Sequence, residues 1–145
     1  MAVSAYEVIS TQTLVSATAS VTLSSIPQTY TDLVFIFSGS ATTGGTDSMD
    51  FQFNGDTSTN YSNTFLSGDG TSSSSGRNSS ANYGIGTLIT SAQIVSNVLQ
   101  IFNYTNTTTF KTILARGNIA GALVRQGVTL WRKTPEANNF YYSQR

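Results

Sequence analysis

The chain of 145 residues contains no cysteine and no histidine, and only 10% of its residues are charged. Missing cysteines exclude disulfide bonds, so stability has to come from packing or from partners. Without imidazole or thiol, the chain lacks the commonest general base near neutral pH, the strongest natural nucleophile and the ligands that zinc prefers. Only a glycosidase-like pair of carboxylates would remain for catalysis, and no acid lies in a pattern that would tune its pKa. We therefore expect no enzyme, name no catalytic, cofactor or metal residue, and leave the binding residues open.

Long apolar runs are also missing. The longest unbroken run covers residues 33–37, which is too short to cross a bilayer. The N-terminus has neither the basic region nor the apolar stretch of a signal peptide. We expect no membrane partner and no signal-dependent secretion.

Ser, Thr and Asn make up more than a third of the chain and alternate with apolar residues. This pattern, broken by turns rich in Gly, Ser and Asn, predicts an all-β fold, a jelly-roll-like antiparallel β-sandwich with one domain over residues 1–145. We expect residues 33–37, which do not alternate, to form the central and best buried strand. Other predicted strands are two within 6–23, divided by a turn near 16–18, and one each at 49–53, 83–90, 98–104, 109–115 and 128–131. A helix over 92–102 is the weaker alternative.

Two connections stand out. Asn54, Gly55 and Asp56 follow a predicted strand and suit a turn, because Asn and Gly tolerate positive φ. Residues 67–82 are rich in Ser and Gly, and we interpret them as a long flexible loop.

The charges are divided along the chain. Every charged residue before Gly76 is acidic, and from Arg77 onward the only acid is Glu136. If the two halves occupied different faces, copies of the chain could attract one another or a charged lattice. We favour the alternative that strands of both halves interleave and mix the charges on one surface.

Some polar and aromatic residues suggest binding sites. Asn54, Asp56, Ser58 and Asn60 place oxygen atoms at every second position, as the start of a calcium loop does, but the glycine and glutamate of such a loop are missing. We interpret them as a polar turn, and Asp47 and Asp50 as ordinary loop and strand acids. Scattered basic residues give no nucleic-acid patch. A sugar site in the loops is a further hypothesis, with core packing as the favoured role of its aromatic residues, Tyr30, Tyr61, Tyr83, Tyr104, Trp131, Tyr141 and Tyr142.

Several segments together resemble a family of small virion proteins of tailed bacteriophages. They are Tyr6-Glu7 with Ile9, residues 25–34 (Ser-Ile-Pro-Gln-Thr-Tyr-Thr-Asp-Leu-Val), Phe53-Asn54-Gly55-Asp56, Asn60-Tyr61-Ser62, Asn103-Tyr104-Thr105, Lys111 and Trp131-Arg132. The resemblance covers most of the chain. It implies a jelly-roll-like structural domain on the surface of the virion, without a catalytic residue set.

The end of the chain departs from that family, whose members continue past the tryptophan into an Ile-Thr-Ser-Ile-Thr-Leu-like strand and a final apolar strand. Codons can be chosen for residues 138–144 that spell Ile-Thr-Ser-Ile-Thr-Leu when read one base later. We therefore hypothesise a frameshift and interpret residues 135–145 as an atypical C-terminal tail. Resequencing of the gene tests this hypothesis.

Two functions fit the resemblance. We favour a capsid decoration protein, bound to the major capsid protein or another virion protein and able to form a homo-oligomer, because the chain shows neither the repeats nor the heptads of a fibre shaft. The alternative is a tail-tip or fibre adhesin domain that binds host glycans.

Overall fold

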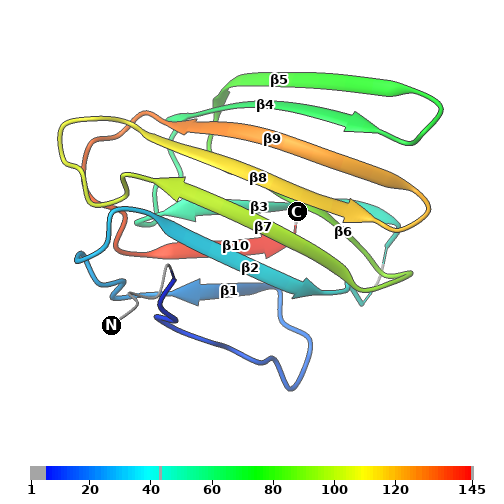
Figure 1. Cartoon of the computed structure of the whole chain (residues 1–145), viewed down its shortest axis with the longest axis horizontal. Coiled ribbons are helices and arrows are strands. Elements are labelled where there is room, and N and C mark those ends of the chain that lie inside the picture. Colours follow the sequence, from blue (N-terminus) through cyan, green and yellow to red (C-terminus); the bar gives the residue numbers. More distant parts are fainter. Residues whose placement is uncertain (1–5, 43, 145) are drawn as a thin grey trace.

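In the computed structural model, residues 6–42 and 44–144 are described, and they form two packed antiparallel β-sheets (Figure 1). The small sheet has the order β1 (Ser20–Leu23), β10 (Phe140–Gln144), β3 (Thr46–Phe53) and β6 (Gly84–Thr90). The large sheet has the order β2 (Leu33–Gly39), β7 (Val95–Phe102), β8 (Lys111–Ile119), β9 (Leu123–Trp131), β4 (Tyr61–Gly68) and β5 (Ser73–Ala81). The predicted all-β sandwich is confirmed. The described residues contain no helix that could span a membrane.

The strand order is that of a jelly roll with one insertion. Without the β8–β9 hairpin, the large sheet would run β2-β7-β4-β5 beside a small sheet of order β1-β10-β3-β6. Two such four-stranded sheets make the two-sheet jelly roll. The inserted hairpin widens the large sheet, and β4 and β5 extend past the small sheet at the top of Figure 1.

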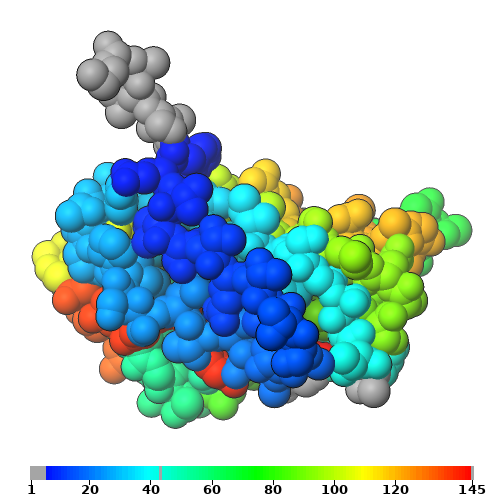
Figure 2. Space-filling view, turned by 90° about the horizontal axis from the view of Figure 1, so that it is seen from below, coloured from blue at the N-terminus to red at the C-terminus, as the bar shows by residue number. Residues whose placement is uncertain are grey.

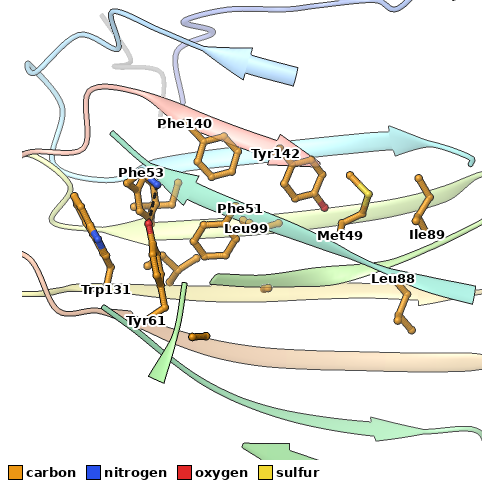
Figure 3. Packing of buried hydrophobic residues seen from close by; sticks show 14 of the residues in the cluster. Met49, Phe51, Phe53, Tyr61, Leu88, Ile89, Leu99, Trp131, Phe140 and Tyr142 are labelled. Atoms are coloured by element: carbon orange, nitrogen blue, oxygen red, sulfur yellow. Dashed lines mark hydrogen bonds between the residues drawn. The ribbon is translucent and has the colours of Figure 1, made fainter. Parts of the chain in front are cut away.

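Aromatic rings from both sheets fill the core (Figure 3). The Trp131 ring lies 5.2 Å from that of Phe53, and the Tyr61 ring stacks on this tryptophan at 6.4 Å. The Tyr61 hydroxyl accepts a hydrogen bond of 3.0 Å from the Phe53 amide. Burial raises the pKa of Tyr61 above its usual value, so this hydroxyl stays neutral and joins the two sheets.

Residues 33–37 are misplaced by the sequence prediction. They form β2, which lies at an edge of the large sheet and not at its centre. Leu33, Phe35 and Phe37 point inward and are half-buried, whereas Val34 and Ile36 point outward and are 36% and 69% exposed. The unbroken apolar run is therefore explained by an apolar outer face and not by burial on both sides.

Residues 67–82 are not a loop. They contain the end of β4, a tight turn and the edge strand β5, which pairs with β4 through its backbone. In the turn, Asp69 accepts hydrogen bonds from the Ser72 and Thr71 amides at 2.6 and 2.8 Å. Most side chains of β5 are exposed, so no apolar alternation marks this strand in the sequence.

The first predicted strand pair is only partly correct. Of residues 6–23, only Ser20–Leu23 form a strand, and residues 1–5 lie outside the described part. Residues 6–19 run along one side of the molecule without strand pairing (dark blue in Figure 2). Tyr6, Val8 and Val15 are 71%, 81% and 100% exposed. Their alternation does not mark a strand in this single copy.

The C-terminal residues 135–145 are not a tail outside the fold. Phe140–Gln144 form β10, which lies between β1 and β3 in the small sheet. Phe140 and Tyr142 are buried in the core, and Arg145 lies outside the described residues. Strands are confirmed at the other predicted positions as β3, β6, β7, β8 and β9, which makes the helical alternative for 92–102 wrong. The predicted turn is also confirmed, with φ of 53° at Asn54 and 68° at Gly55.

Candidate interaction surface

The outward side chains of the large sheet line up in rows across all of its strands. One row contains Val34, Gln100, Leu114, Val128, Thr64 and Arg77, and the next contains Ile36, Val98, Arg116, Gln126, Leu66 and Ser75. Directly paired residues share one face of a sheet. We call the surface formed by these rows and their outward neighbours the outer face.

The outer face carries several large apolar side chains that are in contact with water. Ile36, Leu66 and Val124 are 69%, 64% and 62% exposed, and Val128 is 45% exposed. Single exposed apolar residues are normal on soluble proteins, but a contiguous apolar surface marks a contact site. A shallow hollow of about 550 Å³ lies on this face between Leu66, Val98 and Val124.

Charge is separated between the two sheets. The strands of the large sheet contain basic residues and no Asp or Glu, whereas those of the small sheet contain Asp47 and Asp50 and no Lys or Arg. The strands of the two halves of the chain interleave in both sheets, as predicted. The expected mixing of their charges on one surface is wrong for the strands. Arg77 and Arg116 belong to the outer face, which is thus both apolar and basic.

Arg132 follows β9 at the border of this face and is held in place by the chain around it. Its guanidinium donates hydrogen bonds to the carbonyl oxygen atoms of Ser79 at 2.9 Å and Thr59 at 2.6 Å, and to the Ser62 hydroxyl. Arg116 donates to Gln100 at 3.3 Å. These contacts fix the cations without neutralising them, so the face keeps its positive charge.

The residues that resemble a calcium loop serve the fold. Asp56 accepts hydrogen bonds from Trp131 Nε1 at 2.7 Å and from Asn60 Nδ2 at 2.9 Å. Burial alone would raise the pKa of Asp56, but the hydrogen bonds from Trp131, Asn60 and the Ser58 amide, with the charge of Lys133, lower it below the usual value. Asn54 binds the chain before β10, accepting from the Asn138 and Asn139 amides at 3.1 Å. Across the described residues, no three acidic side chains gather to hold a metal ion.

Most of the aromatic residues proposed for sugar binding belong to the core. Tyr61, Tyr104, Trp131 and Tyr142 are buried, and Tyr30 packs half-buried against the core. Tyr83 and Tyr141 are the two that the structure places together at a surface hollow, on the outer side of the small sheet. Asp50, Gln52 and Asn82 line the same hollow. Of these three residues, only Asp50 was noted in the sequence, and there as an ordinary acid and not as part of a sugar site.

Lys111, a basic residue of the large sheet, is buried and belongs neither to the outer face nor to the hollow beside Tyr83 and Tyr141. Lys111 is fully buried at the start of β8, and its Nζ donates hydrogen bonds to the carbonyl oxygen atoms of Thr109 at 2.9 Å, Thr134 at 3.1 Å and Asn106. Burial lowers its pKa, and the charge of Glu136 opposes this effect. Lys111 thus ties the β7–β8 loop to the segment before β10.

Comparison with known proteins identifies no relative: no family model, curated protein or solved structure matches this chain.

Proposed function

We propose that this chain is a structural protein on the surface of a tailed-bacteriophage particle, a decoration protein bound to the capsid shell through its outer face. The observation that carries the proposal is the exposed apolar surface over Ile36, Leu66, Val124 and Val128. Covering such a surface with protein is favourable by about 25 cal/mol per Å² of apolar area removed from water. The resemblance of several sequence segments to virion proteins supports the particle as the assembly.

The charge of the outer face indicates the chemistry of its partner. Arg77, Arg116 and Arg132 are spread over or beside this face, and the strands beneath it carry no carboxylate. A partner surface with apolar residues and carboxylates complements it, because complementary charge steers association and rejects other partners. We propose that the major capsid protein, or another protein of the shell, provides this complementary partner surface.

Attachment to the particle tests the proposal. Leu66→Glu and Val128→Glu place a carboxylate in the contact, so each variant should bind stripped particles at least about tenfold more weakly than the unmodified chain. Thr22→Glu is the matched control, because Thr22 is also exposed on a strand but lies in the small sheet. Bound protein is measured by sedimentation with particles. Equal binding of all three variants would contradict attachment through the outer face.

Salt separates the apolar contact from simple charge attraction. Exposed charge pairs are screened over about 3 Å at 1 M salt, whereas apolar contacts are not weakened by screening. We expect most of the bound protein to remain on the particle at 1 M salt. Release at moderate salt would instead make the arginines the main contact, and self-association of the free chain would make a second copy the partner.

Imaging of labelled particles locates the chain. Copies distributed over the shell support decoration, and copies confined to one vertex support a tail-associated role.

One observation favours the second candidate function, a tail-tip or fibre domain that binds host glycans. Tyr83 and Tyr141 line a polar hollow on the sheet opposite the outer face.

A further inference from the structure

The large sheet ends in a strand whose backbone is open on one side. β5 pairs with β4 in a regular register over residues 73–78, and no described strand lies on its other side. We call residues 73–78 the open edge, which lies at the top of Figure 1. Such an edge presents unpaired N–H and C=O groups to any extended segment, and proteins often protect it with proline or several charges. This edge has no proline and a single charged residue, Arg77, so it is available for pairing.

Side chains on both faces of the sheet reach the open edge. On the outer face, Arg77 pairs with Thr64 and is exposed. On the inner face, Phe65 pairs with Gly76, and a Cβ atom at position 76 would lie only 2.5 Å from the Phe65 ring. The ring therefore extends over β5 to the border of the sheet, where it is half-buried. A strand added here would meet a cation on one face and an aromatic ring on the other.

The N-terminal arm, residues 6–15, has the composition of a strand but pairs with none in the described chain. Half of its ten residues are β-branched, the type that strands favour. Val8, Ile9 and Val15 are 81%, 40% and 100% exposed. Glu7 is also exposed and accepts a hydrogen bond from the Tyr30 hydroxyl, which raises the pKa of Tyr30. Because water competes for an exposed hydrogen bond, this contact holds the arm to its own copy only weakly.

The arm and the open edge lie on opposite sides of the molecule. The arm passes along the side formed by β1 and β2 (dark blue in Figure 1 and Figure 2), whereas β5 is at the other end of the large sheet. Six strands at a spacing of about 4.8 Å separate the two ends of this sheet by about 24 Å. Pairing within one copy would stretch the arm across this whole width. A neighbouring copy with its β1–β2 side against the β5 side brings an arm directly to the open edge.

Charge complementarity selects the occupant of the open edge. The arm carries one acid and no base, and β5 carries one base and no acid. An antiparallel pairing can place Glu7 of one copy directly opposite Arg77 of the next, and opposite charges in paired positions stabilise a sheet. A second β5 fits less well. Arg77 is the central residue of this strand, so two copies of β5 in full antiparallel register would place like charges opposite each other.

The same register accommodates the apolar residues of the arm. Val8 comes to lie opposite Gly76 on the inner face, against the Phe65 ring. Ile9 comes to lie on the outer face and extends the row that contains Leu66. The acid and the two apolar residues of the arm therefore each meet a matching group of the neighbouring copy.

We propose that the N-terminal arm of one copy pairs antiparallel with the open edge of a neighbouring copy and adds a strand to its large sheet, with Glu7 opposite Arg77. Backbone hydrogen bonds provide the pairing, and the charged pair and the apolar contacts set the register. Because the arm and the open edge lie on opposite sides, the contact is head-to-tail and joins copies into a ring or an open chain. The centre of the outer face stays free for a different partner, so this contact does not depend on attachment to a particle.

Sedimentation velocity of the isolated chain tests the proposal. At about 1 mM, where even weak contacts are populated, we expect species of more than two copies. Deletion of residues 6–15 should leave a monomer. Arg77→Glu and Glu7→Arg should each weaken self-association about tenfold, whereas the double variant Glu7→Arg/Arg77→Glu should restore it, because the inverted pair attracts again. Melting curves check the fold of each variant. A chain that stays monomeric, or a double variant that associates no better than the single variants, would overturn the proposal.

Val128→Glu is the matched control, because it places a carboxylate on the same sheet but two strands away from β5. It should leave self-association unchanged. Loss of self-association in this variant, together with its retention after deletion of the arm, would place the second copy on the outer face and refute the arm contact.

Cross-linking locates the contact, because the chain has no cysteine of its own. A chain with Ile9→Cys is mixed with a chain with Ser75→Cys under mild oxidation. Directly paired residues have Cα atoms about 4.5–5.5 Å apart, which suits a disulfide bond. We expect a mixed disulfide between the two chains, and none when Val128→Cys replaces Ser75→Cys. The proposal fails if chains that still self-associate form no mixed disulfide, or if Ser75→Cys alone gives the higher yield of cross-linked dimer.

Discussion

Two glycines on neighbouring strands of the large sheet give a sharp test of how the sheets pack. Gly117 in β8 pairs directly with Asn97 in β7, whose Nδ2 donates a hydrogen bond of 3.0 Å across the sandwich to the Leu88 carbonyl oxygen. A Cβ atom at position 117 would lie 2.0 Å from Asn97 Oδ1 and 2.6 Å from Thr87 Oγ1. At Gly127 in β9, the nearest atom would be the Thr64 carbonyl oxygen at 3.6 Å, which is an ordinary contact.

The expected free energies differ in sign between the two alanine variants. Overpacking at position 117 costs about 1–3 kcal/mol, and displacing Asn97 from Leu88 adds about 1–3 kcal/mol. The gain from a less flexible unfolded chain, about 0.4–1 kcal/mol, opposes these costs. Gly117→Ala should therefore destabilise the chain by about 2–4 kcal/mol. Gly127→Ala should stabilise it by about 0.5 kcal/mol, because the same gain meets no clash.

Urea unfolding followed by tryptophan fluorescence measures both changes. Trp131 is the single tryptophan and is buried in the core beside Tyr61, so its emission reports loss of packing between the sheets. In a thermal melt, Gly117→Ala should lower Tm by about 10 °C at about 3 °C per kcal/mol. A Gly117→Ala variant as stable as the unmodified chain would show that Asn97 does not cross the sandwich here. Clear destabilisation by Gly127→Ala would contradict the β4–β9 register.

Three further predictions concern a buried amide, a titrating turn and the N-terminal segment. Asn63→Ala should reduce the free energy of unfolding by about 3 kcal/mol, because it removes the partner of two backbone groups and one hydroxyl. Asn78→Ala, an exposed change in the same row of the sheet, should alter it by under about 0.5 kcal/mol in the same urea titration. In NMR titration the Asp69 carboxyl should show a pKa of about 2, lowered by hydrogen bonds from Ser72 and then from Thr71. Since this pKa lies below the ordinary 3.8, the hydrogen bonds to the Asp69 carboxylate stabilise the β4–β5 turn above about pH 4 and are lost as the pH falls toward 2. A titration midpoint of Asp69 near 3.8 would exclude these hydrogen bonds. Residues 6–18 are all exposed, so their deletion should lower the free energy of unfolding by under about 1 kcal/mol. A melting curve that shows a loss of several kcal/mol would mean that this segment packs on the sandwich.

The exposed face explains one error in predicting the fold from the sequence. Residues 33–37 form an unbroken apolar run, which is typical of a strand buried on both sides. An edge strand whose outward side chains belong to an apolar contact surface has the same pattern. Val34 and Ile36 belong to such a surface. Sequence alone does not distinguish burial within one chain from burial against a partner.

The strand β5 was missed for the opposite reason. Its side chains are mostly exposed, so the sequence lacks the alternation that a core imposes. Its backbone hydrogen bonds to β4 do not depend on side-chain type. The residues around the hollow beside Tyr83 were also not predicted as a group. Asn82 and Tyr141 lie far apart in the chain and meet only through the β3–β10 pairing and the contact of Gln52 with Asn82.

The sequence by itself determined the all-β class, the positions of most strands and the Asn54–Gly55 turn, because alternation and positive-φ preferences act between near neighbours. Only the tertiary structure decided the strand order, the central place of β10 and the separation of charge between the sheets. These features depend on which distant strands pair, and that choice follows from closure of the whole sandwich around one core. The apolar outer face and the polar hollow beside Tyr83 and Tyr141 arise on opposite sides of the sandwich for the same reason.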